Sequence, residues 1–139
     1  MSSIIAISDK SRSAIVALTE LAGHGESVPV PIVEISEARD IPLHVLEQLF
    51  ASLRRAGILS SQRGVKGGYS FLRPPAEVTL LDVVETVDGR LGSAESKRAG
   101  VDAVWQQARD LLVGLLGERS IADMVDEEER VSETPMFYI

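Results

Sequence analysis

Apolar residues recur every three or four positions in three successive stretches of the first half of the chain. Residues 9–22, 32–38 and 43–56 are therefore each predicted to form a helix with one buried stripe. Pro42 suits the start of the third helix, and Gly57 suits the position just after its end. Two short helices joined by a tight turn, the second polar on its free face, are typical of a helix-turn-helix.

Two extended segments follow the third helix. Residues 58–63 and 69–72 predict strands, and the glycine-rich segment between them predicts a hairpin tip. A basic hairpin placed directly after a helix-turn-helix is typical of the wing of a winged helix. The sequence therefore predicts an α+β fold, mostly α, with a winged helix-turn-helix DNA-binding domain over residues 1–90.

Three further helices are predicted in the second half of the chain, at residues 79–87, 101–116 and 121–126. The acidic run at 126–129 is interpreted as a solvated, flexible tether that leads to the C-terminal segment. Residues 91–139 are accordingly predicted to supply dimerisation and contact with a partner.

The helix at 101–116 has an apolar stripe that covers much of its circumference, and little other chain remains to bury it. A second subunit is the natural cover for such a stripe. The residues predicted to form this homodimer contact are Val101, Val104, Trp105, Ala108, Leu111, Leu112 and Leu115.

Charge is distributed unevenly along the chain, whose net charge is −7. Residues 1–75 carry eight Lys and Arg against seven Asp and Glu, whereas residues 76–139 carry six against fourteen. Within residues 43–73 the count is five basic against one acidic. Because screening limits charge interactions to about 8–10 Å at physiological salt, this local excess suits contact with double-stranded DNA despite the acidic whole.

Side chains that could contact DNA lie in the predicted recognition helix, in the wing and near the start of the first helix. A helix fits the major groove, and glycines in a hairpin allow close approach to phosphates. Each feature alone could be a solvated surface, but the two in this order favour DNA binding. The predicted contact residues are Lys10, Arg12, His44, Glu47, Gln48, Arg54, Arg55, Arg63, Gly64, Lys66, Gly67, Gly68 and Tyr69.

Composition argues against other classes of function. The absence of cysteine excludes disulfides, thiolate nucleophiles and cysteine-ligated clusters, and His24 and His44 are interpreted as surface residues. No nucleophile is paired with a base, so we expect no enzyme activity, no catalytic residue, no metal and no cofactor. The chain also has no leader peptide and no apolar run of the roughly 18–20 residues that cross a bilayer, so we expect a cytoplasmic protein without membrane contact.

Several motifs resemble the Rrf2 family of winged helix-turn-helix transcription regulators over about residues 4–90. The most specific are LEQLFASLRRAGIL (46–59) and RGVKGGYSFLRPP (63–75), followed by TLLDVVE (79–85). The resemblance implies that the helix-turn-helix reads the major groove, that the wing reaches the minor groove, and that a long later helix forms the dimer. It assigns base contacts to His44, Glu47, Gln48 and Arg63, and phosphate contacts to Lys10, Arg12, Arg54 and Lys66.

Many members of this family ligate an iron–sulfur cluster through three cysteines in the loop before the dimerisation helix. The corresponding residues 90–100 contain none, so cluster sensing is excluded and the chain resembles the cluster-free, CymR-like branch. The C-terminal residues Met136, Phe137, Tyr138 and Ile139 resemble the exposed end of CymR-like members. A C-terminal isoleucine carboxylate is also how serine acetyltransferase enters the active site of cysteine synthase.

These resemblances imply a transcriptional repressor of cysteine and sulfur metabolism genes that is controlled by cysteine synthase bound to the C-terminal tail. Three alternatives remain open. The tail could fold back on the protein's own core, the chain could be a protein-interaction scaffold that does not read DNA, or it could regulate another pathway.

Overall fold

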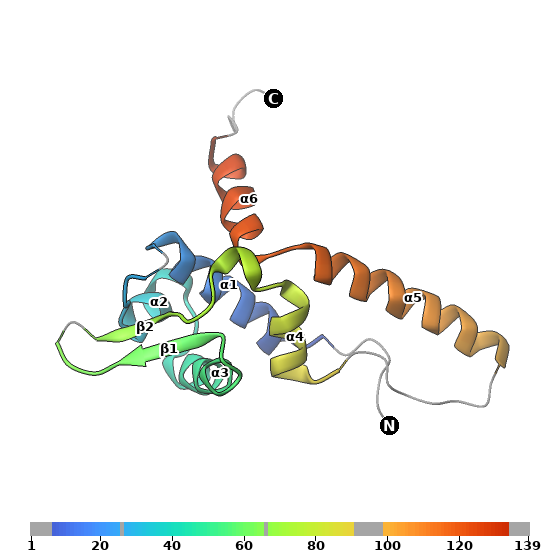
Figure 1. Cartoon of the computed structure of the whole chain (residues 1–139), viewed down its shortest axis with the longest axis horizontal. Coiled ribbons are helices and arrows are strands. Elements are labelled where there is room, and N and C mark those ends of the chain that lie inside the picture. The colour runs from blue at the N-terminus through green and yellow to red at the C-terminus, as the bar shows by residue number, and fades with distance from the viewer. Residues whose placement is uncertain (1–6, 26, 66, 91–98, 134–139) are drawn as a thin grey trace.

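The computed structural model describes residues 7–25, 27–65, 67–90 and 99–133. Within them, a body of helices carries a two-stranded hairpin on one side, and two helices extend away from it (Figure 1). The elements in chain order are α1 (Asp9–Gly23), α2 (Ile32–Arg39), α3 (Leu43–Arg55), β1 (Leu59–Gln62), β2 (Gly68–Phe71), the 3₁₀ turn η1 (Pro75–Glu77), α4 (Leu80–Asp88), α5 (Ala99–Glu118) and α6 (Ile121–Glu133). The predicted α+β, mostly helical winged fold is confirmed.

Local side-chain contacts explain where several helices begin. The Ser8 hydroxyl accepts a hydrogen bond from the backbone N–H of Ser11 and caps α1. Thr79 and Asp82 exchange side-chain and backbone hydrogen bonds at the start of α4, which forms a capping box. These interactions satisfy N–H groups that have no partner within the helix itself.

The turn between α2 and α3 is fixed by a left-handed residue and a side-chain contact. Asp40 has φ 53° and ψ 47° and reverses the chain after α2. The Ser36 hydroxyl then donates to the carbonyl of Ile41 at 2.6 Å. This contact ties the last turn of α2 to the start of the connection into α3.

The hairpin pairs β1 with β2 in antiparallel register, from Leu59 opposite Phe71 to Gln62 opposite Gly68. A further bridge joins Tyr69 to Val30, with both N–H···O distances at 2.9 Å. The base of the wing is therefore attached to the connector that leads into α2.

The hydrophobic core lies between α1, α2, α3, α4 and the base of the hairpin. Its largest fully buried side chains include Phe50, Leu18, Leu21, Ile35 and Leu46. Burial of each such side chain contributes about 1.5–3 kcal/mol to folding. The buried stripe of α3 thus fixes which face of that helix is left free for a ligand.

Helix α6 is longer than the sequence analysis predicted. The acidic run 126–129, interpreted there as a flexible tether after a helix ending at 126, is instead helical, and the helix continues to Glu133. The interpretation was wrong because Glu and Arg favour helices and because Glu127, within the run, pairs with Arg130 one turn later. Ile121 at the start of α6 is fully buried in the core.

A short backbone corner joins α5 to α6. The N–H of Leu80 bonds to the carbonyl of Arg119, and the N–H of Ile121 bonds to the carbonyl of Val78, both at 2.9 Å. Helix α6, from the second part of the predicted division at residue 90, packs on α1 from the first part. The division itself stays a prediction. In the described part of the chain, none of the helices is both long and apolar enough to cross a membrane.

Candidate DNA interface and an ion-pair network behind it

The free face of α3 carries the predicted base-reading side chains. His44, Glu47 and Gln48 are exposed, on the side of the helix opposite the buried Leu46 and Leu49. The amphipathic spacing of the helix produces this arrangement, because burying the apolar stripe leaves the polar positions facing solvent. Arg54 and Arg55 are exposed in the last turn of the same helix.

The hairpin extends from the body beside α3 (Figure 1). Arg63 and Gly64 are exposed near its tip, and Val65 is fully exposed. Lys66, also predicted to contact phosphate, lies outside the described residues.

The glycines at the start of β2 have a steric reason that the sequence did not reveal. A Cβ atom on Gly67 would lie 2.3 Å from the carbonyl oxygen of Gln62, and one on Gly68 would lie 2.3 Å from the carbonyl group of Val30. Gly68 also has φ +144°, a conformation that favours glycine. These two predicted DNA-contact residues thus have a role in folding the wing.

Tyr69 also has a structural role in the wing. Its half-buried ring packs edge-on against Phe50, with ring centroids 5.0 Å apart. An edge-to-face contact of this kind stabilises the attachment of the hairpin to α3. Its predicted contact with DNA stays a prediction.

The start of α1 is held in place by Asp88 at the end of α4. The Asp88 carboxylate accepts hydrogen bonds from the backbone N–H and hydroxyl of Ser8 at 2.8 and 2.7 Å, and from the buried Ser11 hydroxyl at 2.6 Å. Burial opposes ionisation of this carboxyl, but these hydrogen bonds outweigh it and lower the pKa of Asp88. The exposed Lys10 and Arg12 therefore lie at the α4 end of α1 rather than beside the wing tip.

Arg73 does not add to the basic surface in the way that counting charges suggested. Its guanidinium donates to the Asp82 carboxylate at 3.1 Å and to the carbonyl of Glu77 at 2.7 Å. It holds the segment after β2 against the start of α4.

Apolar side chains project from α5 along the predicted dimer stripe. Exposed fractions range from 50% for Trp105 to 77% for Leu111, and Ala108 and Leu112 are half-buried. Val101, Val104 and Leu115 also expose more than half of their surface. Helix α5 extends away from the body over most of its length (Figure 1), so its own chain leaves this stripe uncovered among the described residues.

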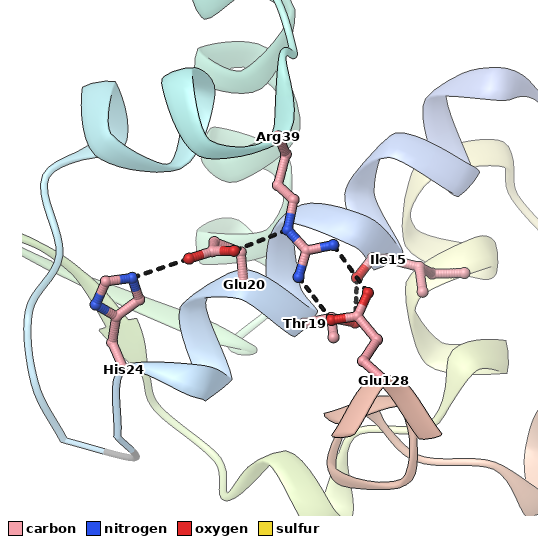
Figure 2. Close-up of polar contacts among 6 residues, drawn as sticks. All are labelled: Ile15, Thr19, Glu20, His24, Arg39 and Glu128. Atoms are coloured by element: carbon pink, nitrogen blue, oxygen red, sulfur yellow. Dashed lines mark hydrogen bonds and ion pairs between the residues drawn. The ribbon is translucent and has the colours of Figure 1, made fainter. Parts of the chain in front are cut away.

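An ion-pair network that the sequence did not predict lies behind the helix-turn-helix (Figure 2). Arg39, the last residue of α2, donates two hydrogen bonds to the Glu128 carboxylate of α6 at 2.7 and 2.8 Å. Its Nε donates to Glu20 of α1 at 2.8 Å, and His24 contacts the other oxygen of Glu20 at 3.1 Å. A bidentate arginine–carboxylate pair is the strongest common form of such contacts.

The network changes the titration of its members. The hydrogen bond from Arg39 is the main cause that lowers the pKa of Glu128, and the same guanidinium lowers the pKa of Glu20. The two carboxylates in turn raise the pKa of Arg39. All three groups are therefore held in their charged forms at neutral pH.

Comparison with known proteins identifies the family of this chain. Residues 7–127 match the family described as Rrf2, "Iron-dependent Transcriptional regulator". The chain belongs to the Rrf2 family. The HTH-type transcriptional regulator IscR of Photorhabdus laumondii is 34% identical over 132 residues, which cover 88% of this chain and 80% of that protein.

Solved structures agree with this assignment. CymR, the global cysteine regulator of B. subtilis, superposes with a TM-score of 0.81 at 27% identity over 88% of this chain and 98% of that one. IscR of T. potens gives the same TM-score at 28% identity over 96% of this chain and 95% of that one. The chain is thus a winged-helix, DNA-binding transcriptional regulator of a family that is not enzymatic.

The residues of this chain do not fit a cysteine-ligated iron–sulfur cluster. None of its 139 residues is a cysteine, so the thiolates that hold such clusters are missing. Within the described ranges, no three or more His, Asp or Glu residues are gathered in a way that could hold a metal ion.

Proposed function

We propose that this Rrf2 regulator is a homodimeric repressor that reads a pseudo-palindromic operator with α3 and the wing. The observation that carries the proposal is the exposed polar face of α3, with His44, Glu47 and Gln48, beside a hairpin that exposes Arg63. Gln and Glu are side chains that can hydrogen-bond adenine and cytosine edges in the major groove. An arginine on a hairpin can neutralise phosphate or enter the minor groove.

Dimerisation through α5 would place two copies of α3 and the wing on one duplex. The exposed stripe of α5 supports this, because a helix with several large apolar side chains in water is stabilised by a partner that covers them. Two-fold symmetry would pair equivalent surfaces and space the half-sites by about 34 Å or a multiple of it. A repressor bound across a promoter in the cytoplasm would block transcription by occupancy.

We further propose that the regulated genes belong to cysteine and sulfur metabolism and that cysteine synthase controls the regulator. Three observations support this: the likeness to CymR, the lack of cysteines for a cluster, and the C-terminal segment Met136–Ile139. An apolar side chain next to a carboxylate, which Ile139 would offer as a C-terminal residue, suits a pocket built for an amino acid. The four tail residues lie outside the described part of the chain, so their sequence alone supports this step.

Salt-dependent binding to a selected duplex tests the DNA-reading proposal. The wild-type protein would first select a duplex from a random pool, and binding would then be measured by fluorescence anisotropy over a range of salt. Arg63→Ala should weaken binding and reduce the slope of log K against log salt by about 1 if the side chain contacts a phosphate. Arg130→Ala removes the same charge from the surface of α6 and should leave the slope unchanged.

Equal slopes for the two variants would refute the role of the wing, and failure to recover any duplex would favour a protein scaffold over a regulator that reads DNA.

The cysteine synthase proposal has a separate test. Deletion of residues 137–139 should abolish co-elution with cysteine synthase from the same organism while the thermal unfolding of the regulator is unchanged. Co-elution of the truncated chain would refute the tail contact.

A further inference from the structure

Helix α2, the first helix of the helix-turn-helix, is anchored in the core by two isoleucines, of which Ile32 is only partly buried. It is eight residues long, and Ile35 is its one buried residue. A helix this short depends on tertiary contacts for its stability, and polar contacts at its end add to the packing against α1 and α3. The contacts at its C-terminal end are the Ser36 hydroxyl on Ile41 and the side chain of Arg39.

Arg39 connects this end of α2 to a helix outside the DNA-reading unit. The arginine lies between α1 and α6, with Glu20 on one side of its guanidinium and Glu128 on the other (Figure 2). Arg39 directly precedes Asp40, the left-handed residue that turns the chain toward α3. Arg39 is therefore one residue away from the turn that sets the direction of α3.

The distal half of α6 is held to the body mainly by polar contacts. Its first residue Ile121 is fully buried, but Val131 near its other end is 60% exposed. A cavity of about 320 Å³ lies between these elements, lined in part by Thr19, Val125 and Ser132. Arg39 and Glu128 both line this cavity, and their charged pair joins α2 to the distal half of α6.

We propose that α6 positions the helix-turn-helix through the pair between Glu128 and Arg39, so that the position of α6 on the body sets the affinity of α3 for DNA. Glu128 is a positioning residue in this arrangement and contacts no nucleotide. The proposal rests on DNA binding by the family fold and adds a part of the chain that is outside the winged unit. It concerns how tightly the protein binds, and leaves the operator sequence unchanged.

The sign of the effect separates positioning from simple charge. Removing a negative charge from a DNA-binding protein should strengthen binding, because the polyanion is repelled less. Glu129→Gln removes such a charge next to Glu128 and should leave affinity unchanged or slightly higher. Glu128→Gln removes the same charge but breaks the bidentate pair, and should weaken binding to the selected duplex by about 3- to 10-fold.

A double variant tests whether Glu128 acts through Arg39. Adding Glu128→Gln to Arg39→Gln should weaken binding no further, because the pair is already broken. The salt slope of Glu128→Gln should equal that of the wild type, since no phosphate contact is lost. A lower melting temperature with an affinity equal to that of Glu129→Gln would overturn the proposal and leave the pair with a purely stabilising role.

Hydrogen exchange supplies a readout that needs no DNA. In Glu128→Gln the amides of α2 and of residues 40–42 should exchange faster, whereas those of α4 should exchange as in the wild type. Unchanged exchange in α2 would refute the coupling even if no duplex had been recovered. Faster exchange together with a failed selection would count against DNA reading by this chain and support the coupling itself.

Discussion

Replacing Leu111 by alanine tests the proposed dimer at its most exposed apolar residue. Leu111 exposes 77% of its surface in the single chain. Full burial of a leucine contributes about 1.5–3 kcal/mol, so covering this fraction would contribute about 1–2 kcal/mol per protomer. Because each protomer of a two-fold dimer supplies one copy, the dimer would lose about 2–4 kcal/mol.

That loss corresponds to a dimer dissociation constant raised roughly 30- to 700-fold. Alanine favours helices more than leucine does, so α5 itself should persist and the change should report on association. Sedimentation velocity over a dilution series would measure the dissociation constant for the wild type and for Leu111→Ala. Val131→Ala, which shortens a side chain of 60% exposure on α6 outside the stripe, is the matched control.

Equal dimer dissociation constants for Leu111→Ala and Val131→Ala would refute the proposed α5 contact. A wild-type chain that is monomeric at micromolar concentrations would refute the dimer itself. In the first case α5 would not be the contact between subunits, and in the second the stripe would have to be covered by a different protein.

Three further predictions concern stability. Gly68→Ala brings a Cβ within 2.3 Å of the Val30 carbonyl group and should lower the free energy of unfolding by at least about 1–3 kcal/mol. Gly64→Ala, where a Cβ meets nothing within 4 Å, should lower it less, and urea unfolding would compare the two variants. Asp88→Ala leaves a buried serine hydroxyl without its acceptor and should cost about 1–3 kcal/mol in the same assay, whereas a change below 0.5 kcal/mol would contradict the anchoring role. The pKa values of the two glutamates of the ion-pair network are lowered from 4.5, so their stabilisation is complete above about pH 4.5 and is lost as the pH falls through the folded-state pKa values. The melting temperature of Glu128→Gln should therefore fall less than that of the wild type on acidification from about pH 5 to pH 3, and parallel curves would refute this cause.

The winged unit could be predicted from sequence because its signals are local. Leucines at helical spacing define α3, Gly57 ends it, and alternation around the glycine-rich segment defines the hairpin. Each of these features depends on residues only a few positions apart. The side-chain contacts that begin α1 at Ser8 and α4 at Thr79 are local in the same way.

The network at Arg39 could not be predicted, because its partners are distant in sequence. Arg39 and Glu128 are separated by 89 positions, and nothing near Glu128 distinguishes it from the acidic residues beside it. A run of charged residues is usually a solvated surface, which led to the wrong interpretation of residues 126–129. If the helix had been continued past 126, about one acidic side chain per turn would have faced the body. That spacing is the only feature of the sequence from which the contact could have been predicted.

The glycines of the wing illustrate a different limit. The sequence suggests that Gly67 and Gly68 permit close approach to the backbone, which was expected of DNA phosphates, but the glycines themselves do not identify the approaching group. In the structure the approaching groups are the protein's own carbonyls, at Gln62 and Val30. A glycine pattern predicted the shape of the hairpin and left the identity of the neighbour undetermined.

The backbone corner between α5 and α6 has a consequence for operator geometry. The hydrogen bonds of Leu80 and Ile121 clamp residues 119–121 against the segment before α4. In a dimer built on α5, the distance between the two winged units would be set by these hydrogen bonds and by the length of α5. It would not depend on the number of residues in segment 91–98. Related regulators could then gain or lose residues in that segment while still recognising half-sites at the same interval.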